Sequence, residues 1–237
     1  TFTPHVNPIV VVPRSGVSPP WKKIDEARHK NVTVEKFEHN GVTIHVLSNE
    51  ILDNREIYPD PKNIKTVRKI DEFGDRLSEI AEDMDFDLVH MHDSFGYKAM
   101  DKFKEMKKPI LLTVHRLHRE CSNWFKTELV ALDKADFVTV VGKTYYQEDE
   151  KELFSKYADK VTYVYNGIDT EFWSVENCSY PGLSREKRRE KQLGKYGLRD
   201  GIFYLFVGRF DSSQKGVDLL LQAGEKFIET KESRMII

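Results

Sequence analysis

The sequence has few cysteines, almost no net charge and no long apolar run. Its 237 residues include two cysteines, Cys121 and Cys178, which are too few for a disulfide framework, so we predict a reducing, cytoplasmic compartment. Lys and Arg number 37 against 39 Asp and Glu, a balance that excludes a polybasic nucleic-acid-binding surface. No apolar run approaches the roughly 18 residues of a membrane-spanning helix. We therefore expect neither nucleic acid nor a membrane as a partner.

Two glycine-rich phosphate-binding motifs are also missing. The chain has 13 glycines, but no two of them are two residues apart, so the dinucleotide motif Gly-x-Gly-x-x-Gly cannot occur. The Walker A pattern Gly-x-x-x-x-Gly-Lys-Ser/Thr is absent as well. Hydrophobic residues nevertheless make up 39% of the chain, which is enough for a folded core and excludes a disordered protein.

Short apolar runs alternate with longer amphipathic segments along the chain. Several runs are apolar throughout and rich in Val and Ile, which is typical of strands buried on both faces of a parallel sheet. The segments between them carry apolar residues three or four positions apart, the period of a helix. This repetition predicts an α/β fold with a doubly wound, mostly parallel, Rossmann-like sheet. The predicted strands cover residues 9–12, 42–47, 87–91, 110–114, 137–141, 161–165 and 202–207, and the predicted helices cover 64–84, 97–106, 122–134, 144–157 and 216–230.

Two regions depart from this repetition. Residues 32–37 and 42–47 alternate in polarity around an Asn-Gly pair, which predicts an antiparallel hairpin. Residues 178–183 have the composition of a linker, and residues 184–196 form a predicted helix with six basic and two acidic side chains. That helix is either solvated, with charge pairs along its surface, or an anion-binding helix. We predict a first Rossmann-like domain over residues 1–180 and the start of a second, nucleotide-sugar-binding domain over residues 181–237.

Polar side chains follow five of the predicted strands. In open α/β sheets, ligands bind beyond the carboxyl ends of the strands, and parallel strands bring these ends to one edge. Four of the eight histidines lie at only two of the ends. We therefore expect a binding site at this edge. The five clusters are His90-Met91-His92-Asp93, His115-Arg116-Leu117-His118, Gly142-Lys143, Asn166-Gly167-Ile168-Asp169 and Gly208-Arg209.

The loop after the last of these strands has the composition of an anion site. Arg209 and Lys215 bracket a polar loop that leads into a predicted helix, whose first backbone N–H groups are free to bind an anion. Two cations beside a helix start suit a phosphate or a diphosphate. An exposed surface turn is the alternative interpretation of the same residues.

The histidines allow three interpretations. His-x-His and His-x-x-His are spacings of metal ligands, but no Cys or Glu joins them, and we predict no metal site. His92, Asp93 and His115 could instead hydrogen-bond a polar substrate directly. Histidines that only cap strand ends are the third possibility, which we favour for His90 and His118.

Four segments resemble glycogen and starch synthases, with the archaeal type of the enzyme as the best match. The resemblance runs from about residue 86 to residue 237, and the segments occur in the same order as in that family. Two of them are strand ends in the first domain, one closes the first domain, and one opens the second domain. They are Asp87-Leu88-Val89-His90-Met91-His92-Asp93, Thr113-Val114-His115-Arg116-Leu117, Asn166-Gly167-Ile168-Asp169 with Trp173, and Gly208-Arg209 with Lys215-Gly216.

The resemblance implies an enzyme of the GT-B architecture, in which substrates bind between two Rossmann-like domains. It implies retaining transfer of glucose from ADP-glucose or UDP-glucose to an α-1,4-glucan, with the sugar nucleotide as donor and no further cofactor. In such an enzyme Arg209 and Lys215 would stabilise the departing diphosphate, and His115 would lie against the transferring sugar. His92, Asp93, Asn166 and Gly167 would bind substrate in the cleft.

Parts of the family pattern are absent from this sequence. The family's first strand with its Lys-Gly-Gly loop is missing, and so is the paired-glutamate motif of the second domain. We therefore expect a fragment, incomplete at both ends, that is inactive alone. Three alternatives stay open: a sugar-nucleotide transferase with another acceptor, a non-catalytic carbohydrate- or nucleotide-binding module, and a metal-dependent hydrolase built on His92 and His115.

Overall fold

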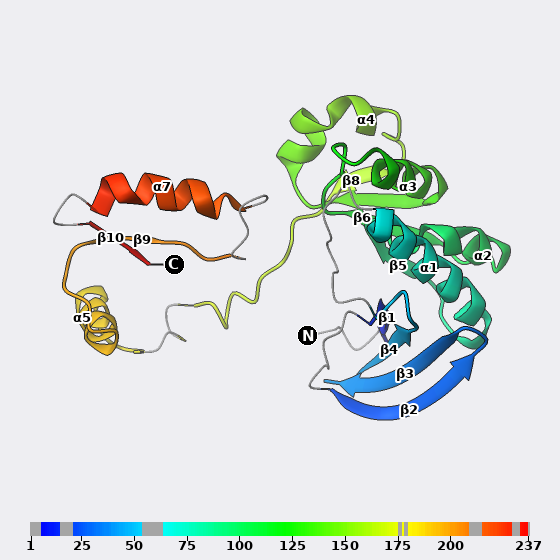
Figure 1. Cartoon of the computed structure of the whole chain (residues 1–237), viewed down its shortest axis with the longest axis horizontal. Coiled ribbons are helices and arrows are strands. Elements are labelled where there is room, and N and C mark those ends of the chain that lie inside the picture. Colours follow the sequence, from blue (N-terminus) through cyan, green and yellow to red (C-terminus); the bar gives the residue numbers. More distant parts are fainter. Residues whose placement is uncertain are drawn as a thin grey trace. The chain divides into compact units, whose positions relative to one another are not determined.

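The computed structural model describes residues 6–14, 21–53, 64–174, 177, 180–208, 215–228 and 233–236. The chain divides into two compact units, Thr1–Asn166 and Gly167–Ile237, which Figure 1 draws in blue to yellow-green and in yellow to red. The predicted boundary near residue 180 lies later than this division, because the sequence marks the linker by composition and not by where packing ends. Within the described ranges, no helix is long and apolar enough to cross a membrane.

The first unit contains a mixed sheet near its amino terminus. Its strand order is β1 (Ile9–Pro13), β4 (Val42–Ser48), β3 (Val32–His39), β2 (Lys22–His29). Strand β1 pairs parallel to β4, whereas β3 pairs antiparallel to both β4 and β2. The predicted hairpin is confirmed: Asn40 and Gly41, at the turn between β3 and β4, have φ angles of 52° and 78°. Asn and Gly tolerate this left-handed conformation better than other residues do.

Strand β2 is an element that the sequence analysis did not predict. Its first residues are charged and exposed, and they lack the alternation that marks a half-buried strand. Cross-strand charge pairs accompany the backbone ladder instead. Lys23 Nζ lies 2.7 Å from Glu35 Oε1, and Lys36 Nζ lies 3.6 Å from Asp25 Oδ2. Opposite charges that face each other across an antiparallel pair stabilise it modestly.

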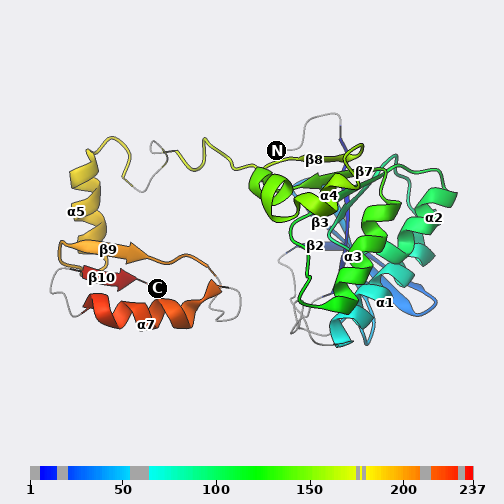
Figure 2. The same ribbon diagram turned by 90° about the horizontal axis from the view of Figure 1, so that it is seen from above.

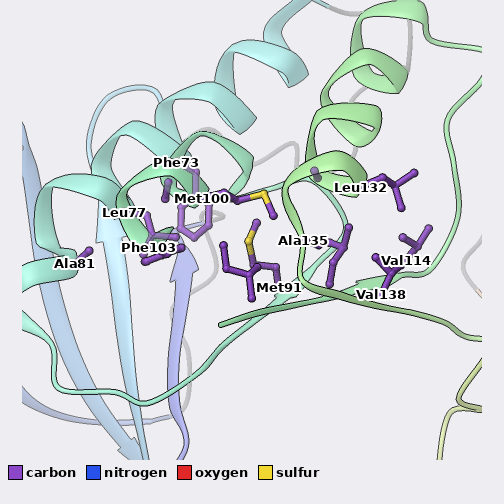
Figure 3. Close-up of a cluster of buried hydrophobic side chains, with 14 of the residues drawn as sticks. Phe73, Leu77, Ala81, Met91, Met100, Phe103, Val114, Leu132, Ala135 and Val138 are labelled. Atoms are coloured by element: carbon purple, nitrogen blue, oxygen red, sulfur yellow. The ribbon is translucent and has the colours of Figure 1, made fainter. Parts of the chain in front are cut away.

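A second, fully parallel sheet follows along the chain. Its strand order is β5 (Val89–His92), β6 (Ile110–Val114), β7 (Phe137–Val140), β8 (Val161–Tyr163). Met91, Leu112 and Val138 project from one face and are nearly fully buried. That face packs on the apolar stripes of helices α1 (Ile64–Ile80), α2 (Met100–Glu105), α3 (Ser122–Lys134) and α4 (Lys151–Ser155). Figure 2 shows α1, α2 and α3 side by side, and Figure 3 shows Met91 beside Met100 and Phe103 of α2.

The opposite face of the parallel sheet carries polar side chains. It carries His90, Thr113 and Thr139, which are joined by hydrogen bonds, and Phe137, which is 60% exposed. The described helices that contribute to the core of the first unit do so together with Met91, Leu112 and Val138 of the other face. The doubly wound arrangement stays a prediction. An apolar stripe reveals that a helix packs on a sheet, but not on which face.

The predicted helices are close to the observed ones. Helix α1 continues into the 3₁₀ turn η1 (Ala81–Asp83), and the 3₁₀ turn η2 (Tyr97–Ala99) precedes α2. The predicted helix over 144–157 is divided into a π-helical segment, η3 (Tyr145–Asp149), and the short α4. These elements contribute apolar side chains to the same hydrophobic core as the strands of the parallel sheet.

The described part of the second unit contains a short parallel pair of strands and two helices. Strand β9 (Ile202–Leu205) pairs with β10 (Ser233–Ile236), and α7 (Val217–Ile228) lies between them in sequence. The predicted basic helix is α5 (Arg185–Lys195), which begins after Ser184, whose side chain accepts a hydrogen bond from the Lys187 N–H. None of its residues is buried, which agrees with the solvated interpretation.

Candidate functional site

The carboxyl ends of β5 and β6 meet at one edge of the parallel sheet. His92 is the last residue of β5 and lies beside Thr113 of β6 in the register of the two strands. His115 directly follows β6. The ring nitrogens His92 Nδ1 and His115 Nε2 are 2.9 Å apart, and the two rings are stacked with their centroids 5.2 Å apart. The structure therefore brings these two predicted site residues into direct contact.

Asp93 ties the two strand ends together. Its carboxylate Oδ1 accepts a hydrogen bond of 2.8 Å from the His115 N–H, and its own N–H donates to the Thr113 carbonyl at 2.8 Å. The residue has a φ of 53°, a left-handed conformation that Asp adopts more readily than most residues. Burial raises the pKa of the Asp93 carboxyl, and the hydrogen bond and charge of His115 oppose that shift. Asp93 thus connects the ends of β5 and β6.

The His92–His115 contact determines what the edge offers to a ligand. Only one proton can occupy the hydrogen bond between the two rings. When both rings are neutral, one outer nitrogen is then a donor and the other is an acceptor, whichever ring donates. Both residues are exposed to solvent. A donor beside an acceptor suits sugar hydroxyl groups, which can accept and donate at once.

His90 contacts this pair from within the same strand as His92. Its ring centroid lies 4.5 Å from that of His92, and its Nε2 lies 2.8 Å from Thr113 Oγ1. Both histidines lie within β5 and point to the same face of the sheet, which the sequence analysis left open. Burial lowers the pKa of His90 and of His92, and the neighbouring histidines lower both further. Both rings are therefore held neutral at pH 7.

The lowered pKa values of His90 and His92 predict that these two residues make the fold less stable in acid. In the unfolded chain these histidines bind protons below about pH 6.5, whereas in the folded protein they do so only at lower pH. These two groups therefore bind more protons in the unfolded state in this window, and their contribution to the free energy of unfolding falls as the pH drops below about 6.5. Thermal melts at a series of pH values measure the effect.

The variant His90→Gln isolates this contribution. Asp93 and Glu128 have raised carboxyl pKa values because they are buried, and they act in the opposite direction as the pH falls. The difference between the wild type and His90→Gln cancels these shared carboxyl terms. We expect the unfolding temperature of the variant to fall less steeply with acid. An equal or steeper fall would contradict the assignment.

Three further residues, Thr127, Glu128 and Tyr145, fix the edge, and the sequence analysis did not predict them. Ser94 and His118, which follow the two strands, contact Thr127 and Glu128 of helix α3. The Tyr145 hydroxyl accepts a hydrogen bond from the Leu117 N–H at 2.7 Å. A signal for Glu128 existed, because it lies four residues after Trp124 and three before Ala131, on the buried stripe of α3. A charged residue on such a stripe indicates a buried partner.

Two predicted residues lie further along the sheet edge. The Val164 N–H donates to the Val140 carbonyl at 2.8 Å and so continues the pairing just beyond β8. Asn166 follows two residues later, is exposed and ends the first unit, and Gly167 begins the second. Their substrate-binding roles stay predictions.

The predicted phosphate site lies only in part within the described residues. Arg209 is outside them, whereas Lys215 is exposed and lies two residues before α7. Gly216 has a φ of 61°, a conformation that glycine adopts without strain, and its carbonyl accepts from the Leu220 N–H at 2.9 Å. Among the residues that the structure describes, no three His, Cys, Asp or Glu side chains form a group that could hold a metal ion.

Comparison with known proteins identifies the family. The sequence profile of Glycosyltransferase Family 4 matches residues 32–172, which include His92, Asp93, His115 and Asn166. A glycogen synthase from Finegoldia magna is 25% identical over 89% of this chain and 55% of its own length. An uncharacterized glycosyltransferase from Methanocaldococcus jannaschii is 24% identical over 64% of this chain and 40% of its own length, so the chain spans about half the length of these curated relatives. Since the profile covers more than half of its residues, the chain belongs to Glycosyltransferase Family 4.

Proposed function

We propose that this chain carries part of the active site of a retaining glucosyltransferase of the GT-B architecture. The reaction moves glucose from ADP-glucose or UDP-glucose to the non-reducing end of an α-1,4-glucan, as in glycogen synthase. The observation that carries the proposal is the contact of His92 with His115, whose main-chain N–H donates to the Asp93 carboxylate. The similarity to a glycogen synthase over 89% of the chain supports the choice of glucose and glucan.

The chemistry of the sheet edge fits a transferring sugar. In the transition state the anomeric carbon becomes oxocarbenium-like and carries positive charge. The carboxylate of Asp93, when ionised, favours positive charge beside it, and the His92–His115 pair offers a donor and an acceptor to the sugar hydroxyls. These groups are preorganised by hydrogen bonds to one another, so little reorganisation is needed when charge develops.

The leaving group needs positive charge at a second place. The donor departs as a nucleoside diphosphate, and negative charge builds on its distal phosphate as the bond breaks. Arg209 and Lys215, which bracket the loop after β9, would stabilise that charge as two fixed cations. Asn166 and Gly167, where the first unit passes into the second, would contact the substrates.

A transfer assay with a panel of donors and acceptors tests the proposal. The protein is made from the complete reading frame that encodes this chain, and labelled ADP-glucose and UDP-glucose are offered with glycogen, maltose or a lipid acceptor. We expect label in glycogen from at least one of the two donors. Label found only in another acceptor would show that this acceptor, and not an α-1,4-glucan, is the substrate. Binding of glucan or nucleotide without turnover would contradict the enzymatic proposal, as would an activity that hydrolyses substrates and depends on a bound metal.

A further inference from the structure

Helix α3 contacts the segment that follows β5. Ser94, directly after Asp93, is 1% exposed, and its Oγ lies 2.8 Å from Thr127 Oγ1. The Thr127 hydroxyl donates its own proton to the Trp124 carbonyl at 2.7 Å, so Ser94 is the donor in the bond to Thr127. The position of Asp93 is thereby tied to α3 through its neighbour in sequence.

The next residue of α3 holds the segment that follows β6. Glu128 Oε2 accepts a hydrogen bond of 2.8 Å from the His118 N–H, and Glu128 Oε1 lies 2.6 Å from His118 Nδ1. Both side chains are buried, with exposed fractions of 4% for Glu128 and 11% for His118. One carboxylate therefore holds both the main chain and the ring of the same residue.

Trp124 also contacts the ring of His118 and restricts its rotation. The two rings are stacked, with centroids 3.8 Å apart and planes inclined by 11°. Trp124 lies one helical turn before Glu128, so both groups come from the same face of α3. The ring of His118 cannot rotate without losing either the carboxylate or the stack.

The segment between His115 and His118 is consequently held at both ends. Its first residue donates its N–H to Asp93, and its last residue donates its N–H to Glu128. Between them the Leu117 N–H donates to the Tyr145 hydroxyl at 2.7 Å. A shift of His118 would therefore move the backbone that carries His115.

We propose that Glu128 is a positioning residue, which sets the place of His115 through His118 while its neighbour Thr127 sets the place of Asp93 through Ser94. The described side-chain hydrogen bonds of Thr127 and Glu128 go to Ser94, Trp124 and His118, and not to His92, Asp93 or His115 themselves. Adjacent residues on one rigid helix fix the spacing of the two strand ends more strictly than two loops could. The expected effect on turnover rests on the proposed function. The positioning of His115 by Glu128 can be tested without measuring any activity.

The structural test uses Glu128→Gln in the complete protein. The carboxamide has one acceptor oxygen and one donor NH₂. Because the His118 main-chain N–H always needs an acceptor, the amide oxygen faces it and the NH₂ faces Nδ1. The proton then moves from Nδ1 to Nε2. ¹⁵N NMR of the histidine rings should show His118 protonated at Nδ1 in the wild type and at Nε2 alone in the variant. Because hydrogen bonds of a neutral amide are weaker than those of the carboxylate it replaces, His118 is held less firmly, and we expect faster hydrogen exchange at the His115 amide.

Glu120→Gln is the matched control. Glu120 lies near the same segment, but it is exposed and pairs with Arg116 at 2.9 Å, so its neutral variant should leave both NMR readings unchanged. A His118 ring that keeps its Nδ1 proton in Glu128→Gln, together with unchanged exchange at His115, would overturn the inference. The two NMR readings test the positioning role of Glu128 even if the wild type transfers no glucose. A lack of glucose transfer would count against the proposed function alone.

Kinetics separate positioning from a purely structural role. At a temperature where both proteins are folded, Glu128→Gln should lower kcat about 10-fold or more while the KM for the donor changes little, because misplacement of a reacting group by about 1 Å can cost as much as 100-fold. Thr127→Val, which releases Ser94, should act in the same direction. A lower unfolding temperature with an unchanged kcat in both variants would show that the contacts serve stability only.

Discussion

Replacing His115 with Ala is expected to lower the rate of glucosyl transfer by roughly 10²–10³-fold, the effect of losing one preorganised contact to the transition state. The side chain is exposed at the sheet edge, where its ring is hydrogen-bonded to His92. The change removes one member of the donor–acceptor pair while the His115 N–H still donates to Asp93. Turnover should therefore fall with little loss of stability. Steady-state kinetics and a thermal melt of the complete protein measure both effects.

His39→Ala is the control for this prediction. His39 is also exposed, but it ends β3 of the other sheet. We expect its variant to keep wild-type turnover. Equal activity of His115→Ala and His39→Ala would show that the His92–His115 pair is not part of the reaction site. A large drop in the unfolding temperature of His115→Ala would assign the lost activity to folding instead.

Arg209→Ala and Lys215→Ala are each expected to lower turnover by about 10²–10³-fold in the same assay. Each removes one of the two cations that would stabilise the departing diphosphate. The effect should be mainly on kcat, because charge on the distal phosphate grows in the transition state. The pair of variants is measured with the nucleotide donor that the wild type prefers.

Lys104→Ala serves as the control for the two cations. Lys104 is exposed on α2, which packs on the parallel sheet of the first unit and carries no predicted substrate contact. Its variant should be as active as the wild type. A change of less than about threefold in Arg209→Ala or Lys215→Ala would refute the role of that residue, since it amounts to less than 1 kcal/mol of transition-state stabilisation.

The sequence was enough to predict most of the elements that position the site. The apolar runs that became β5 to β8 and the periodic segments that became α1 and α3 are strong signals, because burial demands them. Strand β2 gave no such signal, since its charged residues are stabilised by pairs with β3 that depend on register. The face on which the helices pack was also beyond prediction, because periodicity does not encode it.

The site could be predicted in outline but not in detail. The meeting of His92, Asp93 and His115 follows from parallel strands, whose carboxyl ends share an edge. The hydrogen bonds among them depend on the left-handed φ of Asp93 and on the pairing of His92 with Thr113. Glu128 lies ten residues after its partner His118, on another element. Such contacts require the fold to be known first.

The anomeric configuration of the newly formed bond tests the central claim most directly. The complete protein is incubated with glycogen and the sugar nucleotide, whose glucose is α-linked, and the new linkage is read by NMR before side reactions accumulate. We expect new α-1,4 bonds at the non-reducing ends, with the configuration of the donor retained. A β-linked product, or free glucose without any transfer in the presence of acceptor, would contradict a retaining glucan synthase.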